Sequence, residues 1–145
     1  SFFTEKLQFD TQVSTYTAAW YSGVSLDDTT FRMIIVPSEG VSLEEGEAAL
    51  DQAFADFLET GVDEEQLKRI KLQIRASEIY AQDNVDGIAN RYGRALTSGL
   101  TIEDVQAWPE ILDAVTAEDI MQAATLLRRE ASVTGWLIRP EGEAE

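Results

Sequence analysis

The spacing of apolar residues near the start of the chain predicts a β-hairpin. Residues 12–22 and the stretch from Thr30 to Pro37 are rich in β-branched and aromatic side chains, which is typical of strands. Between them lies "SLDDTT", in which Asp27 and Asp28 favour a turn. We therefore expect two antiparallel strands joined by a short polar turn, with the second strand ending between Pro37 and Gly40.

After the hairpin, apolar residues recur at the helical spacing of three and four, which predicts five helices. The sequence marks most of their starts with capping residues, and glycine ends the first helix at Gly61 and the third at Ser98–Gly99. The five expected helices are one capped by Ser42 with Glu45 and ended by Gly61, one capped by Asp63 with Gln66, one over 84–97, a short one capped by Thr101 and interrupted or restarted at Pro109, and one capped by Thr116 with Asp119 and running to about residue 130.

The same spacing predicts which residues face the core. The expected inward-facing residues are Leu43, Leu50, Ala53, Phe54, Phe57 and Leu58 in the first helix, Leu67, Ile70 and Ile74 in the second, and Ile120, Ala123, Ala124 and Leu127 in the fifth, with Trp108, Ile111, Leu112 and Val115 packing the fourth.

A last strand is expected over residues 131–140, followed by an acidic tail at 141–145. The predicted fold is α+β, with two layers: an antiparallel sheet and helices packed on one of its faces. We take residues 1–145 as a single domain or a fragment of one. Three strands are few for so many helices, and the chain begins without methionine. We therefore expect further strands upstream in a longer protein, and self-association through the sheet edge that they would otherwise cover.

The net charge is −16, from 27 acidic and 11 basic residues. Such a field repels nucleic acids and anionic lipids, so partners of both kinds are set aside. No apolar run is long enough to span a bilayer, and no signal peptide is recognisable.

The chain has no cysteine and no histidine. This rules out disulfides, thiol nucleophiles and zinc–thiolate sites, and it removes the commonest general base near neutral pH. A metal site would consist of carboxylates alone, which favours calcium or magnesium. No motif of a serine hydrolase, a phosphate-binding loop or a zinc peptidase is present. The residues alone therefore indicate a non-catalytic domain with no metal site and no cofactor.

Acidic residues cluster in turns and in the first turns of helices, where carboxylates interact favourably with the helix dipole. We expect a structural role for these clusters, since none has the spacing of a calcium-binding loop. They are Asp27–Asp28, Glu44–Glu45–Glu47, Asp63–Glu64–Glu65 and Glu103–Asp104.

Three aromatic residues on expected strands, Trp20, Tyr21 and Trp136, suit either cross-strand packing or a ligand-binding surface. Neighbouring strand residues face opposite sides, so one of Trp20 and Tyr21 should point away from the helices. Arg91 and Arg94, three apart on a helix, either clamp a carboxylate or pair with nearby acidic side chains.

Four stretches carry a resemblance to a known family: "AWYSG" with "DDTTFRMIIVP", "GVDEEQLKRIKLQIRASEIYA", "GRALTSGLTIEDVQAWPEILDAVTAEDIMQAA" and "SVTGWL". Together they resemble the C-terminal domain of pitrilysin/insulinase-like zinc peptidases, in particular the smaller bacterial members related to mitochondrial processing peptidase. The resemblance covers nearly the whole chain, and none of its motifs is catalytic.

The resemblance implies a metalloendopeptidase in which related α+β domains enclose a chamber. Zinc would be held upstream by an HxxEH motif with a distal glutamate, and this chain would form a wall of the chamber with Trp20 and Tyr21 as a candidate substrate-facing surface. The family's substrate-holding arginine and tyrosine are not matched here, because Lys6 is the only basic residue before the first strand and Tyr16 lies within it. Either a second homologous subunit supplies that pair, or the parent is a member of the family whose clamp has changed. A bacterial periplasmic location is expected. A structural subunit without activity and a peptide-binding module of the same fold remain as alternatives.

Overall fold

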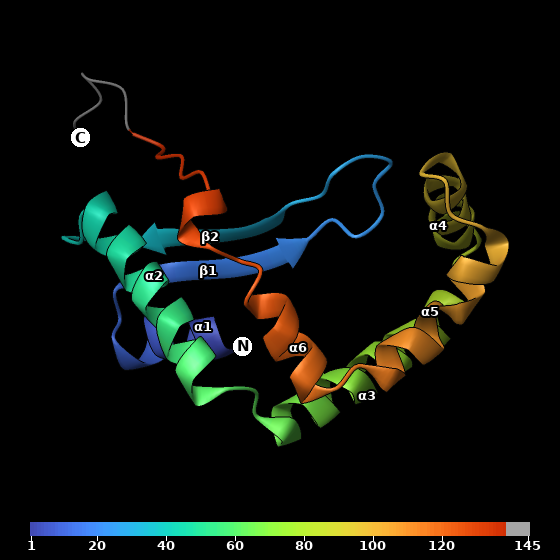
Figure 1. The fold of residues 1–145 in the computed structure, drawn as a ribbon, viewed down its shortest axis with the longest axis horizontal. Coiled ribbons are helices and arrows are strands. Elements are labelled where there is room, and N and C mark those ends of the chain that lie inside the picture. Colours follow the sequence, from blue (N-terminus) through green and yellow to red (C-terminus); the bar gives the residue numbers. More distant parts are fainter. Residues whose placement is uncertain (139–145) are drawn as a thin grey trace.

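The computed structural model describes residues 1–138, and it places a two-stranded antiparallel sheet against helices (Figure 1). The α+β class expected from the sequence is confirmed. In chain order the elements are α1 (Phe2–Thr4), the π-helical η1 (Glu5–Asp10), β1 (Ser14–Tyr21), β2 (Phe31–Pro37), α2 (Leu43–Thr60), α3 (Glu64–Ala81), α4 (Val85–Thr97), α5 (Ile102–Ala114), α6 (Ala117–Ala124) and the 3-10 helix η2 (Arg129–Ala131).

The hairpin is confirmed, although its connection is longer than expected. β1 and β2 pair antiparallel, with Tyr16 opposite Val36 and Tyr21 opposite Phe31. Residues 22–30 form an extended loop and not a tight turn. The predicted turn chemistry is present within this loop, because the Asp28 amide donates to Asp27 Oδ1 at 2.9 Å.

Most of the predicted helix starts are confirmed. Complete capping boxes form at Ser42, Thr101 and Thr116, each with an acidic residue three positions later. Asp63 also caps its helix, with its carboxylate accepting from the amides of Glu65 and Gln66. The expected reciprocal bond from the Gln66 side chain does not occur.

Pro109 neither interrupts nor restarts a helix, as had been expected, because α5 continues through it. A proline in a helix cannot donate to the carbonyl four residues earlier, which here belongs to Val105. That carbonyl is not left unpaired: Arg91 Nη2, on the neighbouring helix α4, donates to it at 3.2 Å. A side chain from α4 thus replaces the backbone hydrogen bond that α5 lacks.

The end of the chain departs most from the sequence-based expectation. The fifth expected helix, α6, ends at Ala124 and not near residue 130. Residues 132–138 form no strand, so the expected third strand is wrong over its described part; residues 139 and 140 lie outside the described range. The segment contacts α2 through side chains, and over residues 1–138 the sheet consists of β1 and β2.

The buried core is small for a chain of this length. Of the expected inward-facing residues Ala53 and Ala124 are buried, whereas Leu58, Ile70, Ala123, Trp108 and Ile111 are exposed. The chain exposes 11315 Å², although a compact monomer of 16.1 kDa would expose about 7,400 Å². Much apolar surface therefore has no cover from the chain itself.

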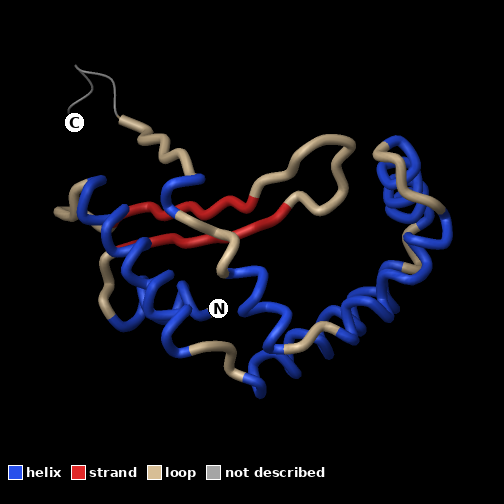
Figure 2. The backbone as a smooth tube through the Cα atoms, viewed as in Figure 1, coloured by secondary structure: helices blue, strands red, loops and turns tan. Residues whose placement is uncertain are grey.

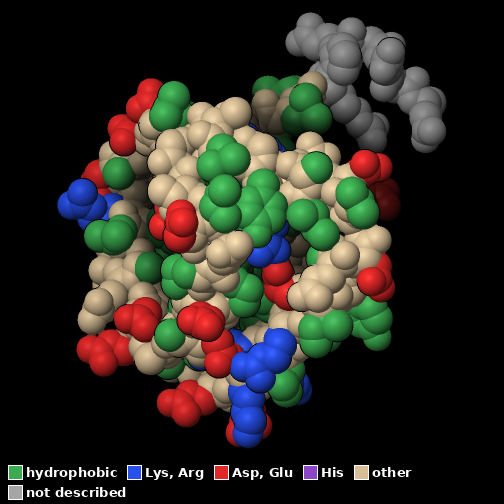
Figure 3. Space-filling model, turned by 90° about the vertical axis from the view of Figure 1, so that its right-hand side faces the viewer, with side chains coloured by type: hydrophobic (Ala, Val, Ile, Leu, Met, Phe, Trp, Pro, Cys, Tyr) green, Lys and Arg blue, Asp and Glu red, His purple; other side chains and the backbone are tan. Residues whose placement is uncertain are grey.

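The shape explains this large surface. The hairpin, α1 and α2 form one end of an open arc, and α3, α4 and α5 form the other (Figures 1 and 2). The loop after β1 reaches across to the far end, where a Cβ built on Gly99 would lie 3.9 Å from Leu26 Cδ1. Viewed onto the far end, acidic side chains spread over the surface with hydrophobic side chains between them (Figure 3). Within residues 1–138, no helix has the length and apolar character needed to cross a membrane.

Candidate functional site

The outer face of the hairpin is an apolar surface that no other described element covers fully. The strand register places Tyr16 beside Val36 and Trp20 beside Arg32 on one face, with Ile34 between them. Large side chains on this face are exposed, and Trp20 retains 44% of its accessible surface. We refer to Tyr16, Trp20, Ile34, Val36 and Arg32 as the outer hairpin face.

The opposite face packs on the N-terminal helices. Thr17 is only 8% exposed, and its hydroxyl accepts from Gln8 Nε2 at 2.7 Å. Met33 and Ile35 share this face and are half-buried. Tyr21 also lies on this side, but at the loop end of the strand it remains exposed. Of the two candidate residues, Trp20 therefore belongs to the outer hairpin face and Tyr21 does not.

The outer hairpin face is nearly free of charge, although the chain as a whole carries −16. The two strands contain no carboxylate and one cation, Arg32, whose Nε donates to the Thr30 hydroxyl at 3.3 Å. Exposed aromatic and aliphatic side chains without charge are typical of the buried centre of a protein interface. The face is thus suited to packing against another polypeptide.

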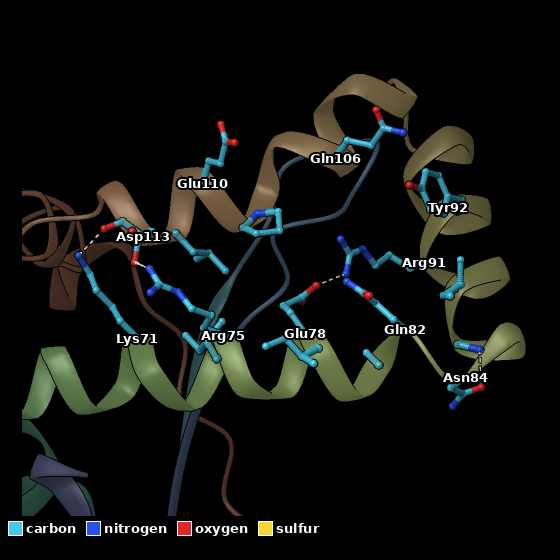
Figure 4. Close-up of a pocket in the computed structure, with 17 residues that line it drawn as sticks. Lys71, Arg75, Glu78, Gln82, Asn84, Arg91, Tyr92, Gln106, Glu110 and Asp113 are labelled. Carbon is cyan, nitrogen blue, oxygen red and sulfur yellow. Dashed lines mark hydrogen bonds and ion pairs between the residues drawn. The ribbon is translucent and has the colours of Figure 1, made fainter.

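Apart from the outer hairpin face, the structure has a hollow of about 630 Å³ between α3, α4 and α5 (Figure 4). Its basic side chains are already engaged by the protein. Arg75 Nη2 lies 2.6 Å from Asp113 Oδ1, and Lys71 Nζ donates to the Asp113 carbonyl at 2.6 Å. Arg91 pairs with Glu78. Among the described residues that line the hollow, each basic side chain thus already has a carboxylate or carbonyl partner within the protein.

Arg91 and Arg94 were expected either to clamp a carboxylate together or to pair with nearby acidic side chains. Arg91 pairs with Glu78, as expected for an arginine in so acidic a chain, and also caps Val105. Arg94 is exposed and lies outside the hollow. For Arg91 the structure therefore supports pairing with a nearby acidic side chain.

Three of the four acidic clusters lie at helix starts, and Asp27–Asp28 lies in the loop after β1. Hydrogen bonds from Ser42 lower the pKa of Glu45, and hydrogen bonds from Thr101 and Thr116 do the same for Asp104 and Asp119. Over residues 1–138, no three acidic side chains converge in a way that would hold a metal ion. What these carboxylates do chemically is to cap helices.

Glu47 has a role that the sequence did not indicate. Its carboxylate accepts from Thr134 Oγ1 at 2.8 Å and from Trp136 Nε1 at 2.9 Å, and it pairs with Arg129. These donors, first of all Thr134, hold the pKa of Glu47 below its usual range. The contacts join residues more than 80 positions apart, and only a coupled substitution pattern among relatives could have signalled them.

The residues compared with the family's substrate clamp are far from forming one. Lys6 Nζ lies 2.9 Å from Asp56 Oδ2, and hydrogen bonding to this carboxylate raises the Lys6 pKa. Tyr16 stands on the outer hairpin face. Lys6 thus ties η1 to α2 and serves the fold.

Comparison of the chain with protein-family models and with curated proteins finds no match.

Proposed function

We propose that this chain is a non-catalytic C-terminal domain of a bacterial zinc-dependent metalloendopeptidase and forms one wall of its peptide-enclosing chamber. The observation that carries the proposal is the outer hairpin face, an exposed and almost uncharged surface on an α+β scaffold. The resemblance of the four sequence stretches to pitrilysin-like peptidases supplies the class of protein. The large accessible surface adds support, because a domain built to be completed by other domains leaves such a surface when it stands alone.

In this proposal the chemistry belongs to another segment. An upstream domain supplies the zinc ligands and the glutamate that activates the metal-bound water. The present chain supplies shape: Trp20 and its neighbours on the outer hairpin face pack against that domain, and the helices hold the hairpin in place. A periplasmic location and a second homologous subunit are part of the same proposal.

The coding sequence before residue 1 tests the proposal. We expect an open reading frame that continues upstream and encodes an HxxEH motif with a glutamate further along. A purified product of that whole frame should contain zinc and cleave extended peptides, and should lose both properties when the first motif histidine is replaced. A frame that starts at residue 1 would contradict the proposal. A frame with a degraded motif would favour the structural subunit without activity.

One observation favours a second candidate, a peptide-binding module. A two-stranded sheet has an unpaired edge on each side, and such edges bind extended peptides by strand addition. Calorimetric titration of residues 1–145 with unstructured peptides would detect this. Binding with micromolar affinity would support the module, and an absence of heat would exclude it.

A further inference from the structure

The segment after η2 alternates in the manner of a strand although it pairs with none. Thr134 and Trp136 point to α2, where both donate to Glu47. Val133 and Leu137, on the other side of the segment, are 99% and 94% exposed. Glu47 thus fixes one side of an extended segment and leaves its apolar side in solvent.

Residues 132–138 also have free backbone groups. Within the described part of the chain, the amides and carbonyls of 133–138 have no hydrogen-bond partner. The segment carries no charged side chain, and a Cβ built on Gly135 would meet no atom within 4 Å. A polypeptide in extended form that approaches at Gly135 would therefore meet no atom on the Cβ side of this residue and no charge on the segment itself.

We propose that residues 132–138 are a homodimerisation strand that pairs antiparallel with the same residues of a second copy, centred on Gly135. In this register Val133 of each copy lies opposite Leu137 of the other, so the two exposed apolar residues cover each other. Thr134 and Trp136 keep their bonds to Glu47 on the far side. The arrangement is isologous and closes after two copies.

One feature of the segment favours a second copy over another partner. The segment is complementary to itself, because the two-fold axis at Gly135 places Val133 of one copy opposite Leu137 of the other. The net charge of −16 acts against association of two copies, and the uncharged segment adds no repulsion of its own at the contact. Two strands of this length give a small interface, so the dimer is weak, and salt strengthens it by screening the repulsion.

A disulfide-trapping experiment tests this inference, because the chain has no cysteine. Opposed residues of an antiparallel pair have Cα atoms about 4.5–5.5 Å apart, which suits a disulfide. Gly135→Cys in residues 1–145 should therefore form a cross-linked dimer in a glutathione redox buffer, and more of it at high salt. Leu126→Cys, exposed but outside the segment, is the matched control and should remain monomeric.

The register is tested in the same background. Adding Val133→Lys and Leu137→Lys places like charges opposite each other and should lower the yield of the Gly135→Cys dimer by about tenfold, with the circular dichroism spectrum unchanged. Equal cross-linking of the Gly135→Cys and Leu126→Cys chains would overturn the inference. So would a yield that the lysines leave unchanged, or one that falls as salt is raised.

Discussion

Replacing Arg91 by Met is expected to lower the free energy of unfolding by about 2 kcal/mol, because the partly buried Glu78 carboxylate and the Val105 carbonyl both lose their partner. Arg91 joins three helices: it lies on α4, pairs with Glu78 on α3 and donates to the Val105 carbonyl on α5. Urea denaturation at neutral pH measures the loss. Arg94→Met, on the same helix and exposed, is the control and should change stability by less than about 0.5 kcal/mol.

The link to Pro109 makes this prediction specific. In Pro109→Ala, the new backbone amide can donate to the Val105 carbonyl, so Arg91 is no longer its sole donor. Replacing Arg91 by Met in that background should therefore cost about half as much as in the natural chain, and a double-mutant cycle measures the difference. Additive effects of the two substitutions would show that Arg91 does not compensate for the proline.

Replacing Glu47 by Gln is expected to release the segment that follows η2. The neutral side chain loses its ion pair with Arg129 and weakens the bonds from Thr134 and Trp136. Trp136 should then show red-shifted fluorescence, and trypsin should cleave after Arg129 roughly ten times faster, as expected for the loss of charge-assisted bonds. Glu44→Gln, exposed in the same turn of α2, should change neither signal.

The same contact predicts a dependence on pH. The hydrogen bonds from Thr134, Trp136 and Arg129 hold the pKa of Glu47 below its ordinary value of 4.5. A depressed pKa means that the contact contributes its full stability above about pH 4.5 and loses it as the pH falls through the lower, folded-state value. The charged groups beside Glu47 are Arg129, which stays cationic, and Asp51, which lies 3.4 Å from the Arg129 Nε. Trp136 fluorescence should shift in this acidic range, and the shift should be absent from Glu47→Gln.

Local chemistry was predictable from the sequence, and contacts between distant residues were not. The hairpin and the helix starts at Ser42, Thr101 and Thr116 depend on neighbours within a few positions, so pattern and capping rules sufficed. The continuity of α5 through Pro109 depends on a side chain from α4, which periodicity cannot show. The short-turn prediction failed because turn-forming aspartates also occur within longer loops.

Periodicity shows which side of an element is apolar, but it does not show what covers that side. Ile70 and Ile111 lie on apolar stripes and were expected to face the core, yet both are exposed, because α3 and α5 bury little against the rest of the chain. The last segment has the alternation of a strand, but Thr134 and Trp136 bind Glu47 on α2, and the segment pairs with neither edge of the sheet. Of the candidate site, Trp20 could be named from the sequence, whereas the Glu47 cluster could not.

Hydroxyl-radical footprinting of Trp20 and Tyr16 tests the central claim most directly, that another polypeptide covers the outer hairpin face. The complete gene product should be compared with residues 1–145 alone, and mass spectrometry distinguishes the labelled residues. If another polypeptide covers this face, oxidation of both residues should be about tenfold lower in the complete product than in residues 1–145, because exposed aromatic rings then become the centre of an interface. Equal oxidation of Trp20 and Tyr16 in the two samples would contradict the account.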